Sequence, residues 1–341
     1  MHGTSGLNRR ELGLLAANIG LLTLGGRAFA QEPAKAMLGH FPSANQQNFS
    51  KATGSMQKAM GAKARVEYVG VTAGPQILTA MAGNSMDLCN IGSSPMVVGF
   101  TQGLPISMVY VHKVIKDDEC LMARGDSGIK GLADLKGRKI GCPFNSSAHF
   151  ALLAALKTVR LTPSDLQLVN LKSDGIVPAW QRKDIDAAYI WNPVLPKLAA
   201  EGGVVIFRSG DLIASGTVIF DGIVVREEFK QKHPDLVLIY LKELDRINGI
   251  YREQPAQVAE VMAPYLQLPP ETALTVAKST HTITPREMLT DTWMGAPGAK
   301  KTGVLDTLMA QAEFLKNADQ VKAIPPDLSR FVDSSFVAKM V

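Results

Sequence analysis

Short runs rich in β-branched and apolar residues alternate along the chain with longer runs in which apolar residues recur at helical spacing. In the first part of the chain this pattern predicts strands at residues 36–41, 64–71, 87–91 and 106–112, and helices at residues 49–60, 75–82 and 95–101. Strands that alternate with helices are typical of an α/β fold, in which helices cover both faces of a mostly parallel sheet.

The alternation of strand and helix patterns restarts at residue 129. It predicts strands at residues 139–142, 166–170, 187–191 and 204–207, and helices at residues 129–135, 147–159, 177–182 and 194–200. Residues 79–88 and 178–187 share one layout, in which a helix end and a turn lead into an Asp-containing strand. We therefore expect two lobes between which the chain crosses near Glu119 and returns near Thr217. Lobe I would comprise residues 31–118 and 218–341, and lobe II residues 119–217.

The first thirty residues follow a different pattern. Arg9 and Arg10 precede an apolar stretch at residues 12–24, which ends in small residues before Ala30. A basic start, a short apolar run and a small-x-small ending are the parts of a secretory signal peptide. We expect cleavage after Ala30 and export to the periplasm. The paired arginines resemble a twin-arginine signal, but such pairs also occur in ordinary signals, and both routes stay open.

Composition narrows the function classes. The 341 residues are 46% hydrophobic and 20% charged, which excludes disorder as the main character of the chain. The net charge is +5, and the predicted signal peptide carries three Arg and one Glu, so the mature chain would carry 5 − 2 = +3. Without a dense basic block, and with only 6% aromatic residues, the chain is not expected to bind nucleic acid.

The residues most often used in catalysis and metal binding form no recognisable motif. No C-x-x-C, H-E-x-x-H, G-x-S-x-G or Walker sequence is present, and the six histidines have no ligand spacing. Cys89, Cys120 and Cys142 lie in apolar contexts, which favours buried free thiols over a disulfide framework. We expect no catalytic residues, no metal and no cofactor.

Two serine-rich segments follow strands at matching positions of the two halves. One contains Ser93 and Ser94 before Pro95, and the other contains Ser146 and Ser147, with His149 in the first helical turn. Each segment alone could be an ordinary helix cap. Because helix N-termini expose backbone N–H groups, the pair together predicts a metal-free site for a small oxyanion.

Other candidates also lie at strand ends or inside strands. Asp221 interrupts an apolar strand, where a carboxylate is costly unless it is paired or faces a ligand, and both alternatives stay open. Glu119, at the crossing strand, is a candidate of the same kind. Trp191 ends a strand and could line a cleft or fill the core. Ser43 and Gln46 belong to the polar loop after the first strand.

Residues 92–95, 143–157 and 179–191 resemble the taurine-binding proteins of ABC importers, within the periplasmic nitrate/sulfonate/taurine-binding group. The likeness runs from about residue 36 to residue 337. It implies a two-lobed type II solute-binding fold with two hinge strands. It also implies a monomer without catalytic activity, which closes around a ligand and delivers it to the transmembrane subunits of an ABC permease.

In this resemblance the serine-capped helix ends would bind the sulfonate of taurine, and Asp221 would bind its ammonium group. Alternative ligands are an alkanesulfonate, nitrate, or a heterocyclic or aromatic acid. An exported enzyme is the alternative class.

Overall fold

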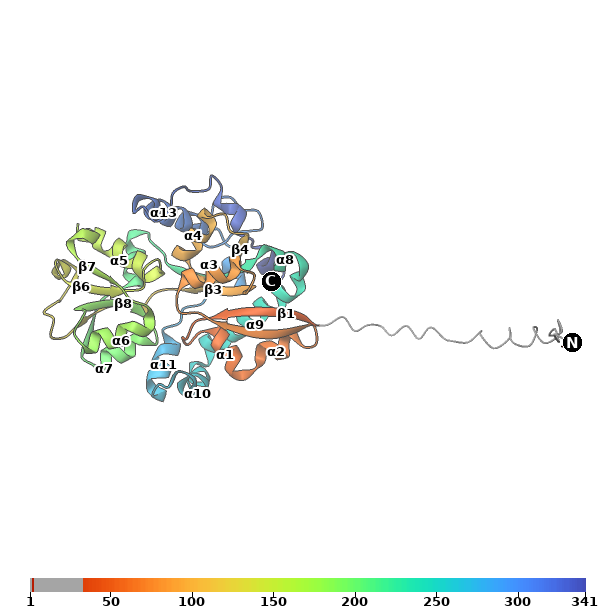
Figure 1. The fold of residues 1–341 in the computed structure, drawn as a ribbon, viewed down its shortest axis with the longest axis horizontal. Coiled ribbons are helices and arrows are strands. Elements are labelled where there is room, and N and C mark those ends of the chain that lie inside the picture. Colours follow the sequence, from red (N-terminus) through yellow and green to blue (C-terminus); the bar gives the residue numbers. More distant parts are fainter. Residues whose placement is uncertain (1, 3–32) are drawn as a thin grey trace. The chain divides into compact units, whose positions relative to one another are not determined.

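Two five-stranded sheets organise the part of the chain that the computed structural model describes, which is residue 2 and residues 33–341 (Figure 1). Residues 34–341 form one compact unit. The predicted signal peptide lies almost wholly outside the described residues and stays a prediction.

The first sheet has the strand order β2-β1-β3-β10-β4. Its strands are β1 (Ala34–His40), β2 (Ala64–Gly70), β3 (Leu88–Gly92), β4 (Ile106–Val114) and β10 (Phe220–Arg226). Strand β1 pairs in parallel with β2 and β3, whereas β10 is antiparallel to both β3 and β4. The flanking helices are α1 (Gln46–Thr53), α2 (Ser55–Met60), α3 (Gly74–Ala82), α4 (Ser93–Thr101), α8 (Glu227–Lys232), α9 (Pro234–Glu253), α10 (Pro255–Leu266), α11 (Pro270–Lys278), α12 (Pro285–Met288), α13 (Gly303–Asn317) and α14 (Ser335–Ala338).

The second sheet repeats this topology with the order β7-β6-β8-β5-β9. Its strands are β5 (Glu119–Arg124), β6 (Lys139–Cys142), β7 (Gln167–Asn170), β8 (Ala187–Trp191) and β9 (Gly203–Arg208). Strand β6 is parallel to β7 and β8, and β5 is antiparallel to β8 and β9. Around it lie α5 (Ser147–Thr158), α6 (Ser173–Gln181), α7 (Val194–Ala200) and the short 3₁₀ turns η1 (Leu132–Leu135), η2 (Pro163–Asp165) and η3 (Ser209–Ser215).

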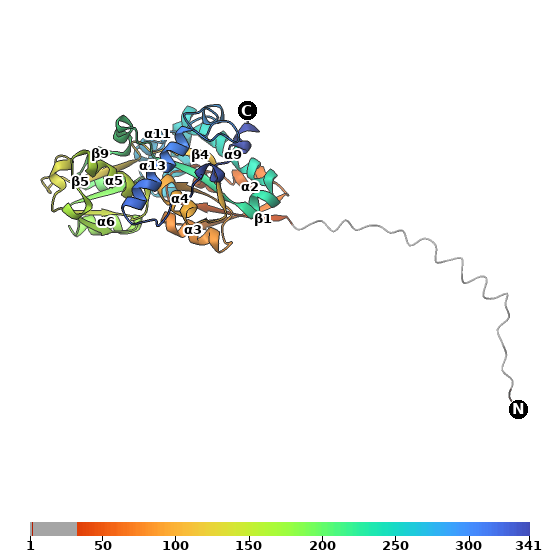
Figure 2. The same ribbon diagram turned by 90° about the horizontal axis from the view of Figure 1, so that it is seen from above.

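The expected α/β class with mostly parallel sheets is confirmed, with one antiparallel strand in each sheet. These two strands, β5 and β10, are the first strands after each crossing of the chain from one sheet to the other. Each enters its sheet without a covering crossover helix, and therefore it need not run parallel to its neighbours. Figures 1 and 2 both place the β5–β9 region at one end of the unit and β1, α2 and α9 at the other. The bounds proposed for the two lobes stay a prediction.

The repeated Asp found in the sequence has the same role in both sheets. Asp87, just before β3, accepts a hydrogen bond from the backbone N–H of Met37 in β1, at 2.9 Å. Asp186, just before β8, accepts one from the N–H of Lys139 in β6, also at 2.9 Å. In each sheet the carboxylate therefore ties the start of one strand to its parallel neighbour.

Three predicted helices differ from the structure. The helix expected at residues 177–182 is α6, which starts four residues earlier, at Ser173. The helix expected at residues 49–60 is two helices, because Gly54 adopts φ +67° and ends α1 in the left-handed region. It also starts earlier, at Gln46, where the side chain of Asn45 caps it by accepting from the N–H of Asn48. The helix expected at residues 129–135 is only the four-residue turn η1.

The two sheets have separate hydrophobic cores, around residues such as Leu38, Phe100 and Val224 in the first and Leu121, Ile140 and Leu152 in the second. Cys89, Cys120 and Cys142 are buried free thiols, as predicted. At the crossings the two connecting segments lie side by side, because the N–H of Ile115 donates to the carbonyl of Ile219 at 2.9 Å. Among the described residues, no helix combines the length and apolar character that crossing a membrane requires.

Candidate functional site

A small pocket of about 60 Å³ lies where the two sheets face each other. The parallel strands contribute residues at or just beyond their carboxyl ends, which is where ligands bind in α/β sheets. The antiparallel strands β5 and β10 contribute Glu119 and Asp221 from their amino ends. Its lining comprises Phe41, Ser43, Asn45, Gly74, Asn90, Gly92, Pro95, Lys113, Ile115, Glu119, Ser146, Ser147, Trp191, Asn192 and Asp221.

The starts of helices α4 and α5 meet in this pocket. Ser146 is the N-cap of α5, and its hydroxyl oxygen accepts from the backbone N–H of His149 at 3.2 Å. Gly92 is the N-cap of α4, and a Cβ atom added to it would lie 3.3 Å from the Cβ of Ser147. The first turns of two helices are thus in close approach, with unpaired N–H groups and positive dipole ends at one place.

Ser146→Ala should destabilise the protein by about 1 kcal/mol, because α5 loses its N-cap hydrogen bond. Ser146→Gly should cost less than Ser146→Ala by the same rule, because both variants equally lose the hydrogen bond that the Ser146 hydroxyl donates to the carbonyl of Pro143 at 2.6 Å. Urea unfolding measures both. Ser334→Ala is the matched control, since Ser334 precedes α14 without forming a cap hydrogen bond. Equal losses for Ser146→Ala and Ser334→Ala would contradict the assigned cap.

A charged cluster of Lys113, Asp118 and Asp221 borders the pocket. Lys113 on β4 stands opposite Asp221 on β10, and its Nζ lies 3.8 Å from Oδ2 of Asp221 and in direct contact with Asp118. Although burial opposes the charge of Lys113, Asp118 and Asp221 raise its pKa above the ordinary value. Burial raises the pKa of Asp221, and the charge of Lys113 partly offsets this effect. Asp221 therefore combines the two alternatives left open by the sequence, since it is in a salt bridge and also lines the pocket.

Glu119 is the centre of a buried hydrogen-bond chain. It is 2% exposed, and its two carboxylate oxygens accept from the hydroxyls of Ser147, at 2.6 Å, and Ser209, at 2.8 Å. Ser209 in turn lies 3.1 Å from the hydroxyl of Tyr189. Burial raises the pKa of Glu119 to about 7, although the two serine hydrogen bonds act in the opposite direction.

Six of the ten predicted site residues line the pocket: Ser43, Glu119, Ser146, Ser147, Trp191 and Asp221. Trp191 also packs against the cores of the second sheet, so the cleft and core alternatives for this residue both hold.

The other four predicted residues lie outside the lining. Ser93 accepts a hydrogen bond from Gln311, and Ser94 is buried. Gln46 donates to Asn248 at 2.6 Å. His149 stacks on Phe144, and burial lowers its pKa to about 4. A cap sequence indicates where a helix starts, but it does not indicate which hydroxyl of the cap faces a cavity.

Several lining residues were missed by the sequence reasoning, above all Lys113 and Asn90. Lys113 could have been found by the rule that selected Asp221, because it is a charged residue within an apolar strand. Asn90 is 3% exposed, and its Oδ1 has no hydrogen-bond partner. The Asn90 side chain also acts to lower the pKa of Asp221, which opposes the effect of burial on that carboxyl. Asn90 therefore offers a free acceptor beside a carboxylate.

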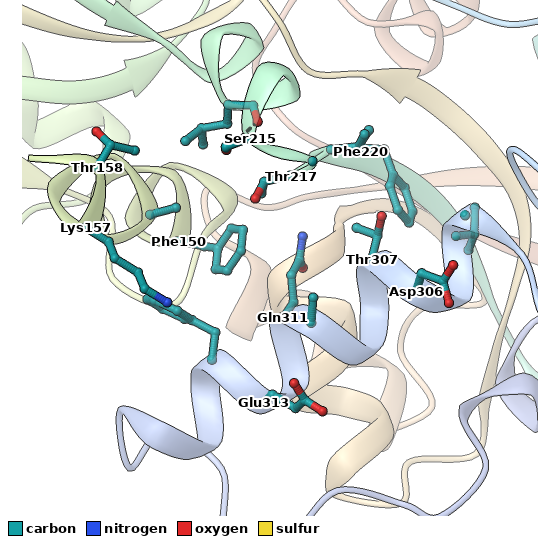
Figure 3. A pocket seen from close by; sticks show the side chains of 18 of the residues that line it. Phe150, Lys157, Thr158, Ser215, Thr217, Phe220, Asp306, Thr307, Gln311 and Glu313 are labelled. Carbon is teal, nitrogen blue, oxygen red and sulfur yellow. Dashed lines mark hydrogen bonds between the residues drawn. The ribbon is translucent and has the colours of Figure 1, made fainter.

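A second, larger groove of about 850 Å³ lies between α5, η3 and α13 (Figure 3). It is on the other face of β10, because neighbouring strand residues point to opposite faces and Phe220 lines the groove whereas Asp221 lines the pocket. The labelled charged residues around this groove, Lys157, Asp306 and Glu313, are all exposed. Buried charge is concentrated in the small pocket instead, which makes the pocket the candidate functional site. Within the part of the chain that the structure describes, no three His, Cys, Asp or Glu side chains are placed to hold a metal ion.

Comparisons with known proteins identify the family and the fold of the chain. Residues 65–257 match the family described as NMT1/THI5 like. The chain is 29% identical to the taurine-binding periplasmic protein of Escherichia coli (strain K12) over 317 residues, which cover 91% of this chain and 95% of the relative.

Solved structures show the same fold. The periplasmic aliphatic sulphonate binding protein SsuA from Escherichia coli superposes with a TM-score of 0.73 at 22% identity, over 90% of this chain and 99% of SsuA. The desulfurization enzyme DSZB superposes with a TM-score of 0.63 at 15% identity, over 90% and 98% of the two chains. Since the family match covers more than half of its length, the chain belongs to the NMT1/THI5-like family and has the type II periplasmic binding protein fold.

Proposed function

We propose that the protein is a periplasmic receptor that captures a small sulfonate, with taurine as the favoured ligand, and delivers it to the permease of an ABC importer. The observation that carries this proposal is the opposite electrostatic character of the two sides of the small pocket. One side has the convergent N-termini of α4 and α5. The other has the carboxylate of Asp221 and the free oxygen of Asn90.

Such a pocket suits a short zwitterion. Helix N-termini attract an anionic group such as a sulfonate, because their N–H groups and dipole ends are positive. A carboxylate beside an unpaired amide oxygen provides acceptors for an ammonium group. Taurine carries both groups, two carbons apart. The similarity to a taurine-binding relative over 91% of the chain supports the same ligand.

Capture by lobe closure is supported by contacts between elements of the two sheets. The side-chain amide of Asn192, after β8, donates to the hydroxyl of Ser279, after α11, at 3.0 Å. Ser147 and Gly92 approach each other across the pocket. A ligand between such surfaces would stabilise the closed arrangement relative to an open one. We propose that the mature chain acts as a monomer and presents both lobes to the permease subunits.

An alkanesulfonate without an amine is the second candidate ligand. Lys113 already provides a counter-charge for Asp221, so the carboxylate does not require a cation from the ligand. The structural similarity to an aliphatic sulphonate binding protein is consistent with this alternative.

An enzymatic role is the remaining class, because the desulfurization enzyme DSZB shares the fold. Nucleophilic catalysis by a cysteine requires an accessible thiolate. Cys120 and Cys142 are buried, and burial raises the pKa of each thiol to about 12. These thiols are therefore poor nucleophiles at neutral pH, which supports binding over catalysis.

A thermal-unfolding panel on the mature chain tests the proposed function. Taurine at about 100 times its dissociation constant should stabilise the protein by about 2.7 kcal/mol. Ethanesulfonate should stabilise it less, and sulfate and nitrate should have little effect. A heterocyclic acid and an aromatic acid complete the panel. Stabilisation by nitrate or an aromatic acid, but by no sulfonate, would contradict the proposal.

A further inference from the structure

The hydrogen bond from Ser147 to Glu119 opposes anion binding in the small pocket. The hydroxyl of Ser147 lies at the meeting point of the two helix N-termini, but it donates its proton to Oε2 of Glu119 at 2.6 Å. While Glu119 is ionised, Ser147 has only lone pairs to offer a ligand. An approaching sulfonate would then meet an acceptor and a carboxylate instead of a donor.

The charges around Glu119 also disfavour the binding of an anion. Lys113 is the cation of the charged cluster, and it faces the carboxylates of Asp118, Asp221 and Glu119. If all three carboxylates are ionised, the group carries a net charge of 1 − 3 = −2. Binding of an anionic ligand is disfavoured there, because like charges in a poorly solvated site repel strongly.

We propose that Glu119 takes up one proton when the ligand's sulfonate binds, so that Ser147 changes from a donor to Glu119 into a donor to the ligand. This inference rests on the proposed function and specifies how the same site accepts an anion. The proton comes from solvent and binds Oε2 of Glu119, which then donates to the oxygen of Ser147. The hydroxyl proton of Ser147 turns to a sulfonate oxygen. Ser209 continues to donate to Oε1.

Four of the other groups that face Glu119 keep their protons between about pH 6 and about pH 8.5. Burial raises the pKa of Cys120 and of Cys142 to about 12, and it raises the pKa of Tyr189 well above its ordinary value. The neighbouring carboxylates raise the pKa of Lys113, so that it stays charged. The groups that face Glu119 from the adjoining elements are Lys113, Asp118, Cys120, Cys142, Tyr189 and Asp221.

Titration calorimetry with taurine, in two buffers of different ionisation enthalpy, counts the protons. Because the pKa of Glu119 is about 7, binding should take up close to one proton at about pH 8.5 and close to none at about pH 6. The dissociation constant should accordingly rise about 30-fold between these two pH values.

Glu119→Gln keeps the shape of the side chain and can donate to Ser147 without gaining a proton. This variant should show no proton uptake, an almost constant dissociation constant from about pH 6 to about pH 8.5, and tighter binding than the wild type at the upper value. Glu243→Gln is the matched control. Glu243 is also buried, but it pairs with Arg246 and does not line the pocket, so this variant should keep the proton uptake of the wild type.

A ligand-free measurement separates this inference from the proposed function. Glu119 has a higher pKa in the folded protein than its ordinary value of 4.5. Its folded state therefore binds more protons than its unfolded state between about pH 4.5 and about pH 7, and stability declines as pH rises through this interval. The wild type should lose stability relative to Glu119→Gln over that interval.

Binding without proton uptake would overturn the inference, and so would uptake that persists in Glu119→Gln. A stability difference that does not change with pH would also overturn it. In those cases the proposed function would stand. If no sulfonate bound, the proposed function and the inference would fail together.

Discussion

Lys113→Met is expected to destabilise the protein by about 3–5 kcal/mol, because it leaves Asp118 and Asp221 buried without their counter-charge. The side chains of Lys113, Asp118 and Asp221 are only 19%, 5% and 13% exposed, so solvent cannot replace the lost ammonium. Removing one partner from a buried ion pair costs far more than the net energy of the intact pair. Urea unfolding at about pH 8 measures the loss.

The pH dependence of Lys113→Met gives an independent check. Burial already raises the pKa of Asp221, and without the ammonium of Lys113 this pKa should be still higher in the folded variant. The destabilising effect of the Asp221 carboxylate is then present above the folded pKa and is relieved as pH falls. The difference in unfolding free energy between wild type and variant should therefore shrink as the pH is lowered towards about 4.

Lys35→Met is the matched control for this prediction. Lys35 pairs with Glu67 at 2.9 Å, but its side chain is 57% exposed. Surface ion pairs contribute little, so this variant should lose less than about 1 kcal/mol. Equal losses for the two lysine variants would show that the charged cluster does not have the energetic role assigned to it.

Asp221→Asn is expected to weaken taurine binding by about 1–3 kcal/mol, which is the range for loss of a charge-assisted hydrogen bond in a buried site. Ethanesulfonate, which has no ammonium group, should bind the variant as tightly as the wild type or more tightly. In the variant Lys113 faces one carboxylate fewer and is freer to attract the sulfonate. Calorimetry with both ligands on both proteins gives the coupling between Asp221 and the ligand amine.

Asp118→Asn is the control for Asp221→Asn. Asp118 contacts the same lysine but does not line the small pocket. Its replacement should therefore affect the two ligands alike. If Asp221→Asn also affected both ligands equally, Asp221 would act by holding the pocket together, and taurine would lose its advantage over alkanesulfonates as the proposed ligand.

Six of the ten predicted residues line the candidate pocket, and the signals that selected them are local. Helix caps such as Ser146 follow from the few residues around them, and Asp221 stands out because it interrupts an apolar strand. Gln46, Ser93, Ser94 and His149 carry similar local signals but lie outside the pocket lining. Local patterns indicate where a loop or helix begins, whereas the direction of each side chain depends on what packs against it.

Lys113 is a site residue whose role depends on a partner that is distant in the sequence. Its place in an apolar strand could have marked it as a candidate, but nothing in the sequence indicates which carboxylates it pairs with. Its partner Asp221 is far away along the chain, and only the insertion of β10 next to β4 brings the two together. The hydrogen-bond chain of Glu119 likewise depends on serines from other parts of the chain. That the oxygen of Asn90 has no partner also follows only from what packs around it.

By itself, the alternation of short apolar runs and helical periods determined the α/β class and the restart of the pattern, because these properties depend on residues close in the chain. Only the tertiary structure decided three further features: the antiparallel insertion of β5 and β10, the charged cluster, and the hydrogen bond by which Glu119 occupies the hydroxyl of Ser147. Electrostatic and hydrogen-bond energies depend on distance and burial in space, and these arise only when separate segments pack together.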